Sequence, residues 1–281
     1  MVKNSYNTIR KIIQEADAIL IGASNGLSIS EGFNIFANDA WFQENFGDFQ
    51  NKYGLRNVLD GCFTKFPTEE EKWGFWSRLV WHKSYQYQPS NIMQNLYRMA
   101  SGRDYFVLTS NGEDHFVPSG FDPHRVFEIE GQYTSMCCAQ HCHEGVYSNR
   151  EAVEKMAKAE HNGLVPTELL PKCPQCGGPM KIHMAADNSF FQSSWFHEKQ
   201  AAYQEFLKRN HGKRLVILEL GVGWRNQLIK EPFMRLTAAE PAATYITFNK
   251  GEVYIPQEIS GKSIGVDGDI ALALANILNE K

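Results

Sequence analysis

The sequence predicts an α/β fold: a Rossmann-like, doubly wound parallel sheet with a helical insertion and an inserted small cysteine-rich module. Three observations lead to this prediction. Short apolar runs, typical of buried parallel strands, alternate with helical patterns, and Gly or Asn follows several of these runs. Five of the six cysteines lie between Cys137 and Cys176, in a stretch that interrupts the alternation. In such folds ligands bind in a crevice at the carboxyl ends of the strands.

The composition is that of a globular protein. The 281 residues suffice for one large domain, or for a large domain that carries a smaller one. With 43% hydrophobic and 21% charged residues, the chain is neither a disordered tail nor a collagen-like repeat. Lys and Arg number 28 and Asp and Glu 32, and this net charge of −4 disfavours nucleic-acid binding. No apolar run approaches the roughly 20 residues of a membrane span. A signal-peptide pattern is also absent, so we expect a cytoplasmic protein without membrane partners.

The first part of the chain begins with an amphipathic pattern over residues 5–17, which predicts a helix with one apolar face. Residues 18–21 are continuously apolar and predict a buried strand, which a loop of small residues follows. Residues 33–100 are helical and rich in aromatic side chains at helical spacing. We therefore expect a helical insertion over 33–100, whose aromatic residues pack in the core or form a surface for a partner.

The remaining elements continue the alternation of strands and helices. Apolar or β-branched runs predict further strands at 105–108, 126–130, 181–184, 214–220, 243–248 and 252–255. Helical periodicity predicts helices at 149–158, 198–210 and 270–278. These patterns place the Rossmann-like domain at 1–135 and 181–281 and the small module at 136–180.

The loop after the first strand has the order of a dinucleotide-binding turn. It reads Gly22-Ala23-Ser24-Asn25-Gly26-Leu27-Ser28. Small residues let a backbone approach a pyrophosphate, and the N–H groups at a helix start favour anions. The G-x-G-x-x-G pattern of hydride-transfer dehydrogenases is absent, as is an acidic residue in the usual ribose-binding context. The loop therefore predicts either phosphate binding or a plain tight turn.

The cysteine spacing predicts a zinc-binding module. A C-x-x-C pair is followed by two glycines, which permit a tight hairpin around a metal. The four-ligand set that we favour is Cys138, Cys142, Cys173 and Cys176. Cys137 or His141 remains an alternative for one member, and metal-free thiols are the alternative to zinc. Four protein ligands leave no open position, so the zinc is expected to be structural. The isolated Cys62 is expected to be a small buried residue.

In their common order, these segments resemble the sirtuins, which are NAD-consuming enzymes with a Rossmann-like large domain and a four-cysteine zinc module. The resemblance covers most of the chain. The loop that starts at Gly22 resembles the family's Gly-Ala-Gly loop, and Thr109-Ser110-Asn111 resembles its Thr-Gln-Asn strand end. Similarly, Glu128-Ile129-Glu130-Gly131 resembles its Glu-Leu-His-Gly segment. The segments 218–221, 248–249 and 265–269 resemble later cofactor-binding strand ends and the last loop before the closing helix.

This resemblance implies NAD as co-substrate, zinc as structural metal, and Asn111 and Glu130 as catalytic residues. The cofactor-binding residues that it implies are Gly22, Ala23, Ser24, Gly26, Ser28, Ser110, Asn111, Glu113, Gly221, Val222, Asn249, Asp269 and Ile270. In this interpretation Asn111 positions the ribose or a water. Glu130 either accepts a proton or stabilises, as an anion, the positive charge that develops on the ribose when the nicotinamide bond breaks.

Three departures from the family pattern change the expected reaction. The Phe-Arg pair after the glycine loop is missing, Glu113 stands where the family has Asp, and Glu130 replaces the catalytic histidine. Loss of this histidine, usually to Gln, is typical of the macrodomain-linked (class M) microbial branch, whose members look like protein ADP-ribosyltransferases. The helical insertion and the 186–188 segment, with Asp187 and Asn188 as candidate ribose or acceptor contacts, also resemble that branch.

We therefore expect a sirtuin-type protein ADP-ribosyltransferase that cleaves the nicotinamide–ribose bond of NAD. The alternatives are an NAD-dependent protein lysine deacylase, an NAD glycohydrolase and a non-catalytic sensor of NAD or ADP-ribose. The resemblance implies a protein acceptor, with a lipoyl-carrier protein as one candidate, and a macrodomain protein as partner. Structural roles also remain open, because Asn111 suits a turn and Glu130 suits a solvated strand end.

Overall fold

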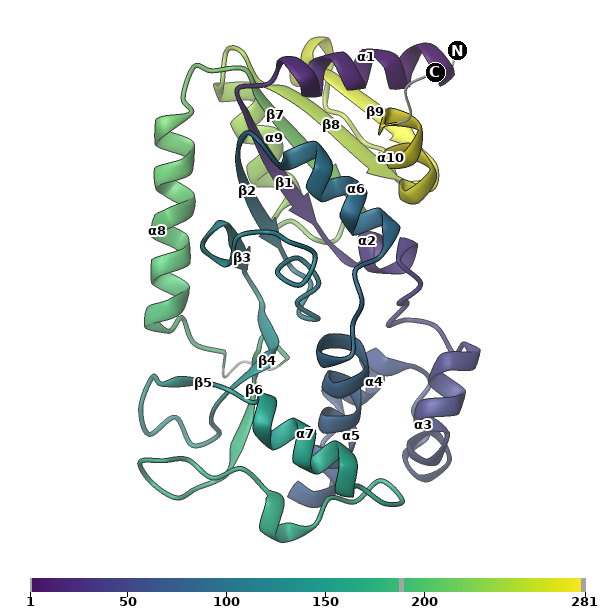
Figure 1. The fold of residues 1–281 in the computed structure, drawn as a ribbon, viewed down its shortest axis with the longest axis vertical. Helices are drawn as coiled ribbons and strands as arrows, with labels where there is room; N and C mark the ends of the chain where they lie inside the picture. The colour runs from purple at the N-terminus through teal and green to yellow at the C-terminus, as the bar shows by residue number, and fades with distance from the viewer. Residues whose placement is uncertain (1, 187–189, 279–281) are drawn as a thin grey trace.

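The computed structural model describes residues 2–186 and 190–278 and has a parallel sheet at one end and a smaller lobe at the other (Figure 1). The sheet order is β3-β2-β1-β7-β8-β9, and all five pairings are parallel. The strands are β1 (Ala18–Ala23), β2 (Asp104–Thr109), β3 (Val126–Glu128), β7 (Leu215–Leu220), β8 (Thr244–Asn249) and β9 (Ser263–Asp267). The sheet is doubly wound and parallel, as the sequence predicted.

The direction of winding reverses at β1, which lies between β2 and β7. Ala23 pairs with Thr109 of β2 on one side and with Leu220 of β7 on the other, so the three strands end at one level. All six residues of β1 are buried because helices cover both faces of the sheet. The loops after these three strands therefore meet at the switch point, where open α/β sheets bind their ligands.

Helices pack on both faces of the sheet. The helices α1 (Val2–Glu15), α2 (Asn25–Ser30), α6 (Asn91–Ala100) and α10 (Ile270–Leu278) share one apolar cluster. On the other face, α8 (Ser194–Arg209) and α9 (Lys230–Ala239) share a second cluster. No helix of the described residues is long and apolar enough to cross a membrane.

The smaller lobe combines helices with a three-stranded antiparallel sheet. Its helices are α3 (Ala40–Tyr53), α4 (Val58–Phe63), α5 (Glu69–Val80), a π-helical turn (Trp81–Tyr85) and α7 (Arg150–Ala159). Its sheet has the order β5-β4-β6, with β4 (Gly131–Cys138), β5 (Val146–Ser148) and β6 (Met180–Met184). One aromatic-rich core joins the two parts, since buried Phe46, Phe75 and Trp73 pack in the same cluster as Cys138 and Met180.

One predicted strand is wrong. Residues 252–255 lie outside the sheet, and the edge strand next to β8 is β9. Val253 and Ile255 lie over Gly265 of β9, where a Cβ atom would come within 2.5 Å of the Val253 side chain. Their alternating pattern therefore reflects packing on the face of the sheet. The helix α8 also begins four residues earlier than predicted, where the Ser193 hydroxyl accepts a hydrogen bond from Phe196 N at 3.3 Å.

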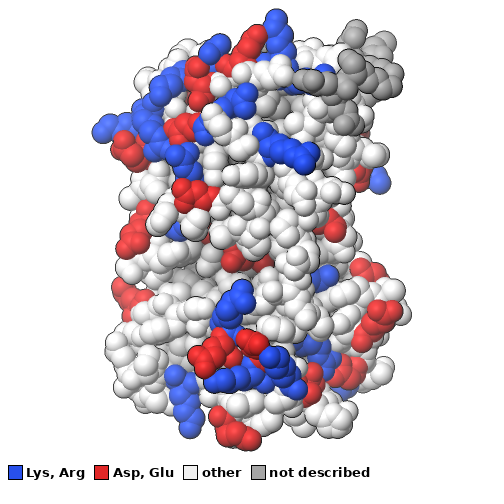
Figure 2. Space-filling model, in the orientation of Figure 1, with Lys and Arg blue, Asp and Glu red and all other residues white. Residues whose placement is uncertain are grey.

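Acidic and basic side chains are interspersed on the face in Figure 2, and they concentrate toward the two ends of the molecule. The band between these ends carries few charges. Lys and Arg side chains gather at the upper left of this face, with Asp and Glu side chains among them.

Candidate active site

Asn111 lies just beyond the end of β2 and faces the loop that follows β1. Its side-chain amide donates to the Ser24 carbonyl at 3.2 Å and to the Ser28 hydroxyl at 2.9 Å. Its backbone N–H donates to the Thr109 hydroxyl at 3.0 Å. The residue is 6% exposed, and its Oδ1 atom is buried without a hydrogen-bond partner. The amide is therefore held by its nitrogen, and its carbonyl oxygen remains available to accept a hydrogen bond.

Ser28 extends this arrangement to a carboxylate. Its hydroxyl accepts from Asn111 and donates to Oε1 of Glu113, a short contact between two buried side chains. The sequence predicted all three residues in the site, and the structure joins them in one chain of hydrogen bonds.

Ser24, Ser110 and Asn226 form a second hydrogen-bonded group beside that of Asn111, Ser28 and Glu113. The Ser110 hydroxyl donates to the Ser24 hydroxyl at 3.0 Å, and Asn226 Nδ2 donates to Ser24 and Ser110 at 3.1 and 2.8 Å. The Oδ1 atom of Asn226 is buried and unpartnered. Sequence reasoning missed Asn226 because it lies in the irregular loop after β7, 202 residues from Ser24, and has no local pattern.

The glycines of the loop bring two backbones together. Gly26 N donates to the Gly221 carbonyl at 3.0 Å, and a Cβ on Gly26 would lie 2.5 Å from the Gly221 Cα. Gly221 itself has a φ of 61°, which favours glycine. Gly22 is required for a different contact, since a Cβ there would lie 2.3 Å from the ring of Phe233. These glycines thus fix the β1 loop against β7 and α9.

The other predicted cofactor-binding residues lie along the same edge. The Ala23 carbonyl accepts from Ser110 N and from the Thr109 hydroxyl at 3.1 and 3.2 Å. Asn249 Nδ2 donates to the Val222 carbonyl at 3.0 Å, and Asp269 accepts from Leu272 N at 2.9 Å in the first turn of α10. The side chains of Val222 and Ile270 are buried in the core, so only their backbones can face a ligand. No described hydrogen bond connects Asn249, Asp269 or Ile270 to Asn111.

A buried and a half-buried carboxyl group, those of Glu128 and Asp114, line a small cavity together with Asn111. Glu128, the last residue of β3, is 2% exposed. Its burial, and to a smaller extent the negative charge of Asp114, raise the pKa of its carboxyl group to about 7. Burial also raises the pKa of Asp114 to about 6, although the hydroxyl of Thr134 donates to it at 3.2 Å. Glu113 lines the same cavity.

Glu130, which the sequence predicted as catalytic, follows Glu128 by two residues. Its side chain is half-buried, and burial raises the pKa of its carboxyl group. Its backbone carbonyl accepts from Ala185 N at 2.8 Å, which ties it to the end of β6. No hydrogen bond between Glu130 and Asn111 is formed among the described residues. The predicted contacts of Asp187 and Asn188 lie outside the described residues.

His115 and Glu31 form a buried ion pair in the wall of this cavity. Its Nδ1 lies 3.0 Å from Oε2 of Glu31, and its Nε2 lies 2.7 Å from the Lys83 carbonyl, so both ring nitrogens face acceptors. The ring stacks on Tyr87 with 3.6 Å between centroids. Burial acts to lower the pKa of His115, but the hydrogen bond from Glu31 and the charges of Glu113 and Glu31 outweigh it, and the pKa is raised.

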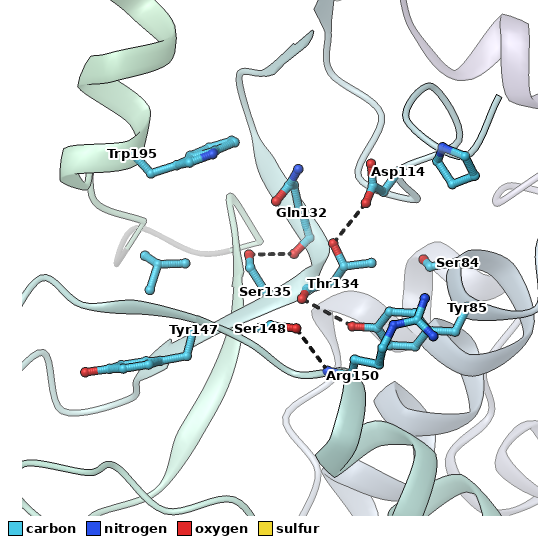
Figure 3. Close-up of a pocket in the computed structure, with 12 residues that line it drawn as sticks. Ser84, Tyr85, Asp114, Gln132, Thr134, Ser135, Tyr147, Ser148, Arg150 and Trp195 are labelled. Atoms are coloured by element: carbon cyan, nitrogen blue, oxygen red, sulfur yellow. Dashed lines mark hydrogen bonds between the residues drawn. The ribbon is translucent and has the colours of Figure 1, made fainter. Parts of the chain in front are cut away.

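A larger polar pocket opens on the other side of Asp114 (Figure 3). Hydroxyl side chains from the π-helical turn, β4 and β5 line it, together with Arg150 of α7 and Trp195 of α8. The Arg150 guanidinium lies 4.4 Å from the ring centroid of Tyr85. Asp114 contributes to the walls of both the inner cavity and this open pocket.

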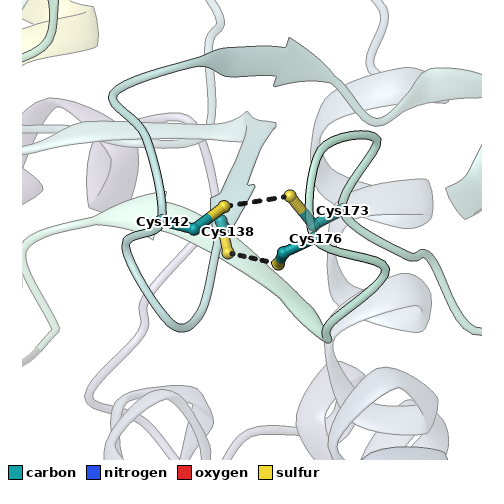
Figure 4. A group of neighbouring side chains, drawn as sticks. All are labelled: Cys138, Cys142, Cys173 and Cys176. Carbon is teal, nitrogen blue, oxygen red and sulfur yellow. Dashed lines mark hydrogen bonds between the residues drawn. The ribbon is translucent and has the colours of Figure 1, made fainter.

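The predicted cysteines come together in the small lobe (Figure 4). The sulfur atoms of Cys138, Cys142, Cys173 and Cys176 all lie within 4.8 Å of one another, with Cys142–Cys173 at 3.5 Å and Cys138–Cys176 at 3.7 Å. These separations fit a tetrahedral Zn²⁺ with Zn–S bonds of about 2.3 Å. Cys137 and His141 are not part of this cluster. The geometry of the four thiols therefore suits structural zinc, the metal that the sequence predicted.

Comparisons with known proteins identify the fold and the relatives of this chain. Over 98% of the chain, the structure superposes on 97% of a solved chain from a study of the mechanism and regulation of Sir2 enzymes, with a TM-score of 0.59 and 16% identity. A structure from a study of sirtuin substrate affinity gives a TM-score of 0.60 at 14% identity, over 96% and 97% of the two chains. A protein ADP-ribosyltransferase of Staphylococcus aureus (strain Mu50 / ATCC 700699) is 32% identical over 275 residues, which are 96% of this chain and 86% of the relative.

The chain belongs to the family of this protein ADP-ribosyltransferase, and its fold is that of the sirtuins.

The chain is therefore an NAD-dependent transferase with NAD as co-substrate, which confirms the predicted enzyme class and co-substrate. A second relative, a probable bifunctional ADP-ribose hydrolase/ADP-ribosyltransferase of Fusarium oxysporum f. sp. cubense, is 29% identical over 290 residues. This match spans 98% of the chain but only 48% of that relative. No family model matches the sequence.

Proposed function

We propose that this protein transfers ADP-ribose from NAD to a protein acceptor, with Asn111 positioning the ribose and Glu130 in place of the usual catalytic histidine. The observation that carries the proposal is the unpartnered Oδ1 of Asn111. It is buried at the switch point of the sheet, and its amide nitrogen is fixed by Ser24 and Ser28. A buried acceptor without a partner is costly, so its presence favours a ligand that donates to it.

The residues around Asn111 fit NAD. Ser24, Ser110 and Asn226 present hydroxyl and amide groups at the strand ends, where dinucleotides bind in this fold. When bound, NAD supplies a nicotinamide–ribose bond whose cleavage leaves positive charge on the ribose. Asn111 Oδ1 accepts from a ribose hydroxyl and thereby orients the sugar. The carboxylates of Glu113 and Glu130 provide negative charge at the edge of the site.

The residue at position 130 favours transfer over deacylation. A deacylating sirtuin uses a histidine as base on a ribose hydroxyl after an acyl-lysine attacks. Here an anionic Glu130 favours the cationic ribose and suits attack by a side chain of the acceptor or by water. The names of the two curated relatives agree with transfer. Deacylase, NAD glycohydrolase and NAD sensor remain the competing functions, and each gives different products.

The partners follow from the same proposal. The acceptor is a protein, for which a lipoyl-carrier protein is a candidate, and a macrodomain protein is the proposed functional partner. Both come from the resemblance to the macrodomain-linked branch, and affinity capture from extracts with and without NAD tests them.

Release of nicotinamide from NAD by purified protein tests the proposal. We expect Asn111→Ala to lower the rate by about 100-fold or more, as for loss of a group that acts in the transition state. Asn91→Ala, at an exposed asparagine that starts α6, is the matched control. Equal rates for the wild type and Asn111→Ala would contradict the role of Asn111.

A further inference from the structure

Glu128 is a buried carboxyl group that the proposed reaction does not use. It ends β3, is 2% exposed, and its Oε2 atom has no hydrogen-bond partner among the described residues. Glu128 also lines the inner cavity together with Asn111. A carboxyl oxygen left without a hydrogen bond inside a protein is expensive, and such groups cluster at functional sites.

Asp114 is the second carboxyl of this cavity. Its backbone lies in the left-handed region, with a φ of 62°, which is uncommon for a residue other than glycine. The Oδ2 atom of Asp114 accepts a hydrogen bond from the Thr134 hydroxyl, whereas its buried Oδ1 atom has no hydrogen-bond partner among the described residues. Because Asp114 also lines the open pocket, it lies between the inner cavity and solvent and offers a route for protons.

The charged groups around the pair come from several elements. Glu128 faces Asp114 and Lys199 of α8, and Gln132 of β4 is its neutral hydrogen-bonding neighbour. Asp114 faces Glu113, His115 and Lys199. The Lys199 ammonium donates to the Pro123 carbonyl, and the charge of His115 is matched by Glu31.

Two adjacent carboxylates cannot both ionise at low cost, so one of them keeps a proton. Burial raises the pKa of both groups, to about 7 for Glu128 and about 6 for Asp114, which is consistent with one shared proton near neutral pH.

We propose that Glu128 and Asp114 share one proton and act as positioning residues, which hold a single negative charge beside Asn111 during the reaction. This inference rests on the proposed function, because the charge acts on the positive ribose. When both Glu128 and Asp114 are protonated, the cavity has no negative charge from this pair, and cleavage of the nicotinamide–ribose bond is slower. When one of the two is ionised, its negative charge stabilises the positively charged transition state.

The first test follows the carboxyl protons in the free protein. In protein labelled with ¹³C at the Glu and Asp carboxyl groups, NMR is expected to show two coupled titrations between about pH 5.5 and 7.5. Glu128→Gln removes one of them and moves the other to lower pH, because Asp114 loses its neighbouring carboxylate. Asp114→Asn has the converse effect. Glu258→Gln, at an exposed residue of the 3-10 turn Gln257–Lys262, leaves both titrations in place. Absence of any carboxyl that titrates above pH 5.5 would overturn the shared proton.

The second test measures nicotinamide release against pH for the same proteins. We expect an acidic limb near pH 6 in the wild type. In Glu128→Gln this limb moves to lower pH by about one pH unit, and the maximal rate falls about 10-fold, whereas Glu258→Gln matches the wild type. A pH profile of Glu128→Gln that coincides with the wild type, while Asn111→Ala is inactive, would overturn the inference and leave the proposed function intact. An inactive wild type would overturn the function, and the NMR titration would still decide whether the proton is shared.

Discussion

The side-chain amide of Asn111 and the hydroxyl of Ser28 lie 2.9 Å apart, and this hydrogen bond joins the end of β2 to the helix that follows β1. The Ser28 hydroxyl in turn donates a hydrogen bond to the Glu113 carboxylate. The orientation of Asn111 thus depends on a residue that need not touch NAD. Ser28 therefore positions the Asn111 amide, whereas Asn111 itself contacts the ribose in the proposed reaction.

Ser28→Ala is therefore expected to reduce activity more than stability. The substitution removes the hydroxyl that holds both Asn111 and Glu113, and loss of one such hydrogen bond typically costs about 1–3 kcal/mol, or roughly 5- to 150-fold in rate. Ser30→Ala, in the same short helix with its hydroxyl bonded to the Gly26 carbonyl, is the matched control. Comparison of nicotinamide release by the two variants tests this role, and a larger loss in Ser30→Ala would contradict it.

Because Gly26 packs closely against Gly221, any side chain at position 26 is predicted to destabilise the fold. Gly26→Ala drives a Cβ into the backbone of Gly221, and we expect destabilisation of about 1–3 kcal/mol. Gly47→Ala is the control, because Gly47 lies in α3 and a Cβ there would meet no atom within 4 Å. Alanine at this position is expected to be neutral or stabilising. Denaturant unfolding of the two variants measures the difference, and equal midpoints would refute the close packing.

A buried ion pair supports the sheet near the same edge. Lys230 and Glu219 are 1% and 0% exposed, their Nζ and Oε1 atoms lie 2.5 Å apart, and the Thr247 hydroxyl donates to the same carboxylate at 2.9 Å. Lys230→Met leaves an unpaired buried carboxylate and should cost about 3–5 kcal/mol. Lys155→Met, which breaks the exposed pair of Lys155 with Glu151, should cost nothing measurable. Thermal unfolding distinguishes them, and a wild-type midpoint for Lys230→Met would contradict the assignment.

Glu128 also predicts how stability depends on pH. Its pKa is about 7 in the folded protein and near the ordinary 4.5 when unfolded, so the folded protein binds the proton more tightly. The stabilisation is complete below about pH 4.5 and is lost as the pH rises through 7, a difference on the order of 1–3 kcal/mol. Glu128→Gln should flatten this decline between pH 5 and 8. A decline that is just as steep in the variant would assign it to other groups.

The cysteine cluster predicts about one zinc ion per chain. Elemental analysis of protein purified without chelator measures it, and Cys176→Ser should lower both zinc content and thermal stability, because the folded small lobe depends on the metal. Cys62→Ser, at a cysteine outside the cluster, should leave the zinc content unchanged. Wild-type protein without zinc would contradict the ligand set.

The sequence predicted those features of the structure that depend on residues close together along the chain. The apolar run of β1, the hairpin at Cys173 and the strand-end Asn111 each carry a pattern within a few residues. The contact between Gly26 and Gly221 joins residues 195 positions apart and has no such pattern. No local pattern distinguished Glu128 as a buried carboxyl group, because its burial depends on the packing of α8 and of the loop after β2. Similarly, β9 was hidden because Gly265 interrupts its apolar run under Val253.

The identity of the products tests the central claim most directly. Purified protein is incubated with NAD and a cell extract, and all products are analysed by mass spectrometry, with Asn111→Ala in parallel. We expect an extract protein to gain an ADP-ribosyl group together with release of nicotinamide, and neither change with the variant. Appearance of O-acyl-ADP-ribose in place of a modified protein would contradict ADP-ribosyl transfer and identify the chain as a deacylase.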